Sequence, residues 1–107
     1  MAFNTATLAG GGASRSNSNG GGCPFGNTII ANNTAPSGPD CYGAANVDSA
    51  DYNLIGNTSD CTISGATTHN IYNPPGGAQL APTLALNGST KGTRTHALLV
   101  GSPAIAH

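Results

Sequence analysis

A linked run of short β-forming motifs between residues 27 and 64 constrains the fold more than any other feature of this chain. The motifs are Asn27-Thr-Ile-Ile-Ala-Asn-Asn33, Gly38-Pro-Asp-Cys-Tyr-Gly43, Tyr52-Asn-Leu-Ile-Gly56 and Ser59-Asp-Cys-Thr-Ile-Ser64. Each has a core of a few apolar or β-branched residues, and the Asn, Gly and Ser residues that enclose it favour turns. Strands this short cannot bury an apolar face alone, so the pattern predicts that neighbouring units stack.

Three tripeptides share one pattern: Leu8-Ala9-Gly10, Ile30-Ala31-Asn32 and Ile55-Gly56-Asn57, with offsets of 22 and 25 residues. Periods of about 20 or more residues indicate stacked-repeat architectures. The alignment predicts that Ile30 and Ile55 form an internal ladder, and that Asn32 and Asn57 stack at a corner. The expected fold is therefore all-β, a short parallel β-helix of about three to four coils.

The chain of 107 residues has room for one domain, with the coils expected in residues 1–79. Pro74-Pro75-Gly76-Gly77 ends the regular ladder, because proline lacks the backbone donor. Residues 80–107 hold most of the leucines, and proline and glycine keep them from forming one helix. We expect this part to be an irregular C-terminal segment that caps the last coil and protects its apolar end.

Composition excludes several classes of protein. Charged residues make up only 7% of the chain and the net charge is -1, so a basic groove for nucleic acid cannot form. No apolar run approaches the roughly 18 residues of a membrane span. The start of the chain shows no signal peptide, although the composition suits an extracellular protein, so we expect a piece of something longer.

Cys41 and Cys61 lie in matching contexts, Pro-Asp-Cys and Ser-Asp-Cys, 20 residues apart. That spacing is about one coil and predicts a disulfide between neighbouring rungs. The alternative is two buried free thiols that act as small apolar residues. Cys23, the third cysteine, has no evident partner.

The order of the motifs, followed by His96-Ala-Leu-Leu-Val-Gly-Ser-Pro-Ala-Ile105, resembles the C-terminal part of bacterial right-handed parallel β-helix proteins of the choice-of-anchor Q domain type. It is similar, more loosely, to polymorphic outer-membrane proteins with pectin-lyase-like β-helices. The resemblance covers roughly residues 20–105. It implies a right-handed helix in a secreted or surface-attached protein, and no established catalytic residues. Ala106 and His107 depart from the family pattern, which commonly continues with Asp.

Few side chains suit chemistry. Asp40 and Asp60 each adjoin a cysteine and could stack one rung apart, but turn formation explains Asp40 better than acid catalysis does. The three histidines, His69, His96 and His107, show no ligand spacing, and no cofactor motif is present. We therefore expect no catalytic residue, metal site or cofactor, and no enzymatic activity.

The function expected from the sequence is structural: a segment of a secreted or bacterial cell-surface β-helix, with a role connected to adhesion. One alternative is a fragment of a carbohydrate-active, pectin-lyase-like enzyme. Another is a module that binds carbohydrate or a surface, for which Tyr42 and Tyr52 are the candidate ligand-facing aromatics. Candidate partners are the rest of a longer β-helix, surface glycans or further copies of the chain, because exposed rungs favour association.

Overall fold

The computed structural model describes residues 1–15, 24–43, 47–88, 92 and 94–105, and within those parts it contains seven short strands and no helix. The strands are β1 (Ala13–Arg15), β2 (Ile29–Ile30), β3 (Cys41–Gly43), β4 (Val47–Ala50), β5 (Leu54–Ile55), β6 (Ile63–Ala66) and β7 (Ile71–Tyr72). All pairs between these strands are parallel. The expected all-β class is therefore confirmed.

The largest sheet has the strand order β2-β5-β7. Ile30 lies opposite Ile55, which in turn lies opposite Tyr72. Both isoleucines are fully buried, and their β-branched side chains suit the pleated interior of a sheet. The predicted ladder of Ile30 and Ile55 is confirmed.

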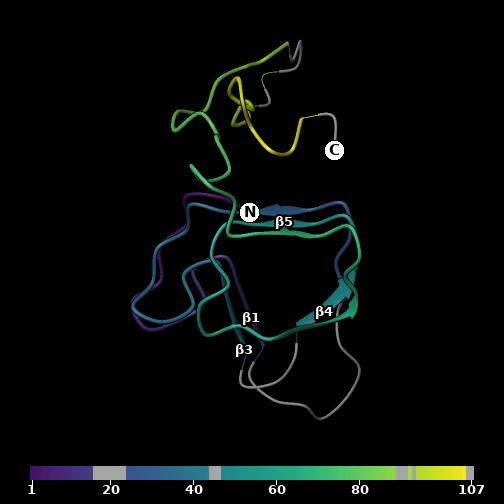
Figure 1. The fold of residues 1–107 in the computed structure, drawn as a ribbon. Coiled ribbons are helices and arrows are strands. Elements are labelled where there is room, and N and C mark those ends of the chain that lie inside the picture. The colour runs from purple at the N-terminus through teal and green to yellow at the C-terminus, as the bar shows by residue number, and fades with distance from the viewer. Residues whose placement is uncertain (16–23, 44–46, 89–91, 93, 106–107) are drawn as a thin grey trace.

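Two further parallel sheets complete the layered arrangement, with the orders β1-β3 and β4-β6. We call the stretch of chain from one strand to the next strand that pairs with it a pass. Each pairing joins one pass to the next, as when Val47 lies opposite Ile63 and Ala13 opposite Cys41. Figure 1 shows these passes lying over one another, with β5 along one side of the molecule and β1, β3 and β4 along others. Backbone ladders rather than a thick core organise this part of the chain.

The first of the three aligned tripeptides does not take the place that the sequence predicts. Ala31 lies opposite Ala2, not Ala9, and Ala9 lies opposite Ser37. Leu8 is 81% exposed and adds nothing to the internal ladder. The offset between the first two passes is 29 residues at Ala2 and Ala31 rather than 22, because the turns between strands differ in length from pass to pass.

An asparagine ladder precedes the largest sheet. The side-chain Oδ1 of Asn53 accepts a hydrogen bond from the N–H of Thr28 at 3.1 Å, and Oδ1 of Asn70 accepts one from the N–H of Asn53 at 2.9 Å. Each of these residues lies just before its strand, so side-chain amides extend the backbone ladder around the corner. The sequence predicts stacked asparagines after the strands, at Asn32 and Asn57. There the hydrogen bonds between passes are made instead by Asn33, which accepts from the Asn4 N–H, and by Asn73, which accepts from the Thr58 N–H, both at 3.0 Å.

Gly12 marks the closest approach between the first and second passes. A Cβ there would lie 2.4 Å from the carbonyl oxygen of Asp40 and 2.7 Å from Cγ2 of Ile30. The missing side chain lets the Gly12 N–H donate to the Pro39 carbonyl at 3.0 Å. Glycine at this position is therefore a packing requirement.

The C-terminal segment packs on the outer face of the β2-β5-β7 sheet. Ala78 and Leu80 are buried against Ala31 and Leu54, and Ala104 packs against the same cluster. Two antiparallel bridges, Leu80 with Leu98 and Ala85 with Thr95, fold the segment back on itself. Figure 1 shows this green-to-yellow part of the chain beside the sheet that contains β5. Leu54 in the middle strand is thus covered by the C-terminal segment, while Ile30 and Ile55 face the interior.

Candidate functional site

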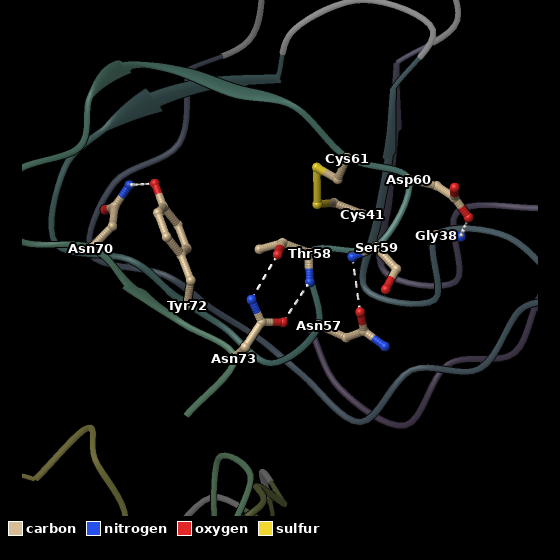
Figure 2. The surroundings of a disulfide bond; sticks show 10 residues. All are labelled: Gly38, Cys41, Asn57, Thr58, Ser59, Asp60, Cys61, Asn70, Tyr72 and Asn73. Carbon is tan, nitrogen blue, oxygen red and sulfur yellow. Dashed lines mark hydrogen bonds between the residues drawn. A yellow bond between two sulfur atoms is a disulfide. The ribbon is translucent and has the colours of Figure 1, made fainter. Parts of the chain in front are cut away.

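The predicted disulfide between Cys41 and Cys61 is present and joins two neighbouring passes of the chain. Their Cα atoms are 5.5 Å apart, the ordinary spacing of a disulfide. Cys41 is fully buried in β3. Beside the bond, Oδ2 of Asp60 accepts a hydrogen bond from the N–H of Gly38 at 3.3 Å (Figure 2). Cys23 lies outside the described residues.

Asp40 has a structural environment. It is almost fully buried, and its Oδ1 accepts hydrogen bonds from the N–H and Nδ2 of Asn33 at 3.0 and 2.9 Å. Asn33 in turn accepts from Asn4 of the first pass at 3.0 Å. Asp40 therefore holds Asn33 of its own pass, and Asn33 makes the contact with the first pass. Asp40 and Asp60 serve different partners.

The two candidate aromatics lie in different surroundings. Tyr42 lies in β3, opposite Ser14 in β1. Tyr52 lies between β4 and β5 and is 52% exposed. Tyr52 lines a pocket together with residues of β5 and β7.

Asp51, Tyr52 and His69 form a cluster. The two aromatic rings stack with centroids 4.4 Å apart and planes 2° from parallel. Asp51 holds His69 at two points: Oδ1 accepts from the His69 N–H and Oδ2 contacts Nδ1, both at 2.7 Å. The imidazole is thereby fixed in place between a carboxylate and a phenol ring.

The backbone at this cluster adopts a conformation that L-residues avoid. Asp51 has φ 76° and Tyr52 has φ 58°, both in the left-handed region. Two successive residues other than glycine in this region store backbone strain, on the order of 1–3 kcal/mol each. The Oγ of Ser49 accepts from the Asp51 N–H at 3.0 Å and supports the turn. Strain of this kind is concentrated at functional sites.

The pocket beside the stacked rings is shallow, with a volume of about 80 Å³. Its lining comes from β5, β7, the turns before them and the C-terminal segment. The lining residues are Tyr52, Asn53, Leu54, His69, Ile71 and Ala104. The amide of Asn53 is already committed, because Nδ2 donates to Phe25 and Ser49 while Oδ1 accepts from Thr28.

The contact with His69 lowers the pKa of Asp51 below its ordinary value of 3.8, chiefly through the hydrogen bond between the two side chains. Because the folded pKa is depressed, the contact stabilises the protein fully above pH 3.8 and is lost as the pH falls through the folded value. We therefore expect the free energy of unfolding to decrease less between about pH 5 and about pH 2 in Asp51→Asn than in the parent protein. Urea unfolding across this range measures the free energy of unfolding of both proteins. Parallel pH profiles for the parent and for Asp51→Asn would contradict the contribution of Asp51.

Sequence reasoning found Tyr52 but missed His69 and Asp51. The signal that could have found them is the offset between β5 and β7, which places Leu54 opposite Ile71. Applied to the preceding residues, this offset brings the turn at Asp51 beside the turn at His69. This offset becomes apparent only from the structure, which pairs Leu54 with Ile71 and Ile55 with Tyr72.

The other candidate residues lie elsewhere. The ring of His96 contacts Phe3 at 4.6 Å, and its Nδ1 contacts the Ala81 carbonyl at 2.7 Å. His107 is outside the part of the chain that the structure describes. Within that part, no group of three or more His, Cys, Asp or Glu side chains is placed to hold a metal ion. The described residues also contain no helix that is long and apolar enough to cross a membrane.

No family model, curated protein or solved structure matches this chain.

Proposed function

We propose that this chain is a segment of a right-handed parallel β-helix, with a structural role in a secreted or cell-surface protein. The observation that carries the proposal is the direction of the strand pairing. Each pass of the chain pairs in parallel with the pass that follows it, at three separate sides of the molecule. A continuously wound coil is the simplest path that satisfies such pairing.

The lengths of the passes support the same path. The first and second passes are offset by 28 residues where Ala13 lies opposite Cys41. The second and third are offset by 25 residues in the largest sheet. The third and fourth are offset by only 17 residues there and by 16 residues between β4 and β6. Offsets measured at two sides nearly agree for the first and second passes and for the third and fourth, as they do when every pass is one coil.

The proposed handedness rests on a general rule. Connections between parallel strands of one sheet are right-handed in about 98% of cases, because strand twist favours that path. The connections from β2 to β5 and from β5 to β7 are of this type. The resemblance to choice-of-anchor Q domain proteins gives the same expectation, and it supplies the surface location.

The disulfide supports a location outside the reducing cytoplasm. Disulfides persist in secreted and surface proteins, and they are rare where thiol reductants are maintained. The Cys41–Cys61 bond ties two proposed coils together and suits a stalk exposed to the medium. The enzyme alternative draws on Asp40 and Asp60, and the burial of Asp40 against Asn33 favours the structural role.

The location can be tested with an antibody raised against the folded chain. The antibody should label intact cells of the organism that encodes the protein, and brief protease treatment of intact cells should remove the label. An antibody against a cytoplasmic protein serves as the control for lysis. Label that appears only after the cells are broken would overturn the surface assignment.

A further inference from the structure

Asn87 and Gly88 lie near the outer end of the hairpin that residues 80–98 form, which we call the C-terminal hairpin. Its two arms are joined at Ala85 and Thr95, where each N–H donates to the carbonyl oxygen of the other residue, at 3.0 and 2.8 Å. Asn87 and Gly88 follow this bridge. Both are exposed and both have left-handed backbone, with φ 42° and 91°. Asparagine followed by glycine is a pair that turns of this kind favour.

An asparagine in this position is open to attack by its own backbone. The amide nitrogen of the next residue bonds to the side-chain carbon Cγ, the Cγ–Nδ2 bond breaks, and ammonia leaves with the proton of the attacking nitrogen. The five-membered succinimide that forms is opened by water at either of its two carbonyl groups, which yields aspartate or isoaspartate. The net change exchanges ammonia for water, and it needs no oxidant or cofactor.

Gly88 leaves the attacking nitrogen accessible. A Cβ on this residue would meet no described atom within 4 Å apart from its chain neighbours, so the surroundings of the nitrogen are open. Among the described asparagines, only Asn87 is followed by glycine. Asn57 is followed by Thr58, whose branched Cβ crowds the nitrogen, and Asn73 is followed by a proline, whose nitrogen carries no proton.

The side-chain amide of Asn87 also connects the two arms of the hairpin. Its Nδ2 donates to the carbonyl oxygen and to Oγ1 of Thr95, both at 3.0 Å. The reaction removes this nitrogen, and the carboxylate that replaces it only accepts hydrogen bonds. Because a carbonyl oxygen is also only an acceptor, the bond from residue 87 to the Thr95 carbonyl cannot form again. In the isoaspartate product the main chain also runs through Cγ, which changes the path of the turn.

We propose that Asn87 is a modification site, at which the chain deamidates spontaneously through the Gly88 nitrogen, and that this change opens the outer end of the C-terminal hairpin. The inner end does not depend on Asn87. There the Ala81 N–H donates to the Ala97 carbonyl at 2.8 Å, and Leu80 is buried in the cluster on the sheet. The modification therefore loosens the tip of the hairpin and leaves its base attached.

The test follows the purified full chain as it ages in native buffer at mildly alkaline pH. Peptide mapping by mass spectrometry should find a growing fraction of Asn87 that is heavier by the difference between an amide and a carboxyl group. Electron-transfer fragmentation should identify isoaspartate beside aspartate in the modified peptide. Asn57, the internal control, should stay unmodified.

A second sample, reduced and unfolded in guanidinium chloride, gives the time that the same pair needs to convert without structure. The proposal is overturned if Asn87 in the folded chain is still intact when the unfolded chain has converted completely. Aspartate without isoaspartate would exclude the succinimide. Equal conversion of Asn57 would show that the exposed Asn87-Gly88 pair has no special reactivity.

The variant Gly88→Ala tests the attacking nitrogen. It adds a Cβ beside this nitrogen at an exposed residue, so the fold should be retained, as circular dichroism can verify. The loss of isoaspartate at Asn87 is expected. A folded variant that forms isoaspartate as fast as the parent would refute attack at an unhindered Gly88 nitrogen.

The variant Asn87→Asp reproduces one product and tests its consequence for the hairpin. Hydrogen exchange at the Ala85 and Thr95 amides should become about two- to tenfold faster, the effect of losing one hydrogen bond, while exchange at Ala81 is unchanged. Asn57→Asp, the same change outside the hairpin, should leave all three rates as in the parent. Unchanged exchange at Ala85 and Thr95 in Asn87→Asp would contradict the opening of the hairpin.

Discussion

Replacing Ile55 with alanine is expected to lower the free energy of unfolding by about 2–5 kcal/mol. Ile55 is fully buried, and it lies in the middle strand of the β2-β5-β7 sheet, opposite Ile30 and Tyr72. Its removal leaves a cavity between two passes, and the backbone ladders on both sides prevent the site from collapsing. A loss of this size is a large part of the 5–15 kcal/mol that typically stabilises a domain.

Urea unfolding followed by circular dichroism measures this loss. The matched control is Ile105→Ala, the same change at a residue that is 49% exposed in the C-terminal segment. The control should change the free energy of unfolding by less than about 1 kcal/mol. Equal losses in the two variants would show that Ile55 is not part of a packed ladder.

Removing the disulfide is expected to cost about 3 kcal/mol of stability, the value that chain entropy gives for a loop of this length. The bond closes a sequence separation of 20 residues between Cys41 and Cys61. The double variant Cys41→Ala/Cys61→Ala should therefore unfold at a lower urea concentration. In the unfolded parent chain the bond restricts the two passes that it joins, and this restriction is absent from the variant.

The control for the disulfide is Cys23→Ala, which leaves the Cys41–Cys61 pair intact and removes the one thiol that could exchange with it. This variant should keep the stability difference between oxidised and reduced protein. Mass spectrometry of the unfolded, unreduced chain provides the direct check. Alkylation of Cys41 without a reductant would contradict the bond.

The pairing of Ile30 with Ile55 and the disulfide were both accessible from the sequence, because each depends on a short motif that is repeated once, after 25 and after 20 residues respectively. The first pass was not accessible. Ala2, rather than Ala9, lies opposite Ala31 because the first pass is longer than the second. A search for a fixed period fails when the strands are two to four residues long and the turns set the offset.

The asparagine ladder shows a second limit. Asparagines flank the strands on both sides, at Asn53 before β5 and at Asn57 after it. Composition and spacing do not distinguish them. Asn53 is identified as the ladder residue because it is only 1% exposed and is hydrogen-bonded to three neighbouring segments. These are long-range contacts that a local pattern cannot reveal.

Only part of the candidate site could be predicted from the sequence. Tyr52 stood out as an aromatic beside a predicted strand, in a chain with only five aromatic residues of the Phe, Trp and Tyr types. His69 looked like an isolated histidine. Its contacts with Asp51 and Tyr52 arise only because the third and fourth passes are offset by 17 residues in this sheet.

The most direct test of the account is a measurement of hydrogen-bond scalar couplings in the isotopically labelled chain. Stacked parallel passes predict a coupling between the Leu54 amide nitrogen and the Thr28 carbonyl carbon. They predict a second coupling between the Ile71 amide nitrogen and the Asn53 carbonyl carbon, since these groups are hydrogen-bonded at 2.9 and 2.8 Å. Couplings that pair these strands in antiparallel order, or the absence of both couplings from a folded chain, would contradict the proposed coil.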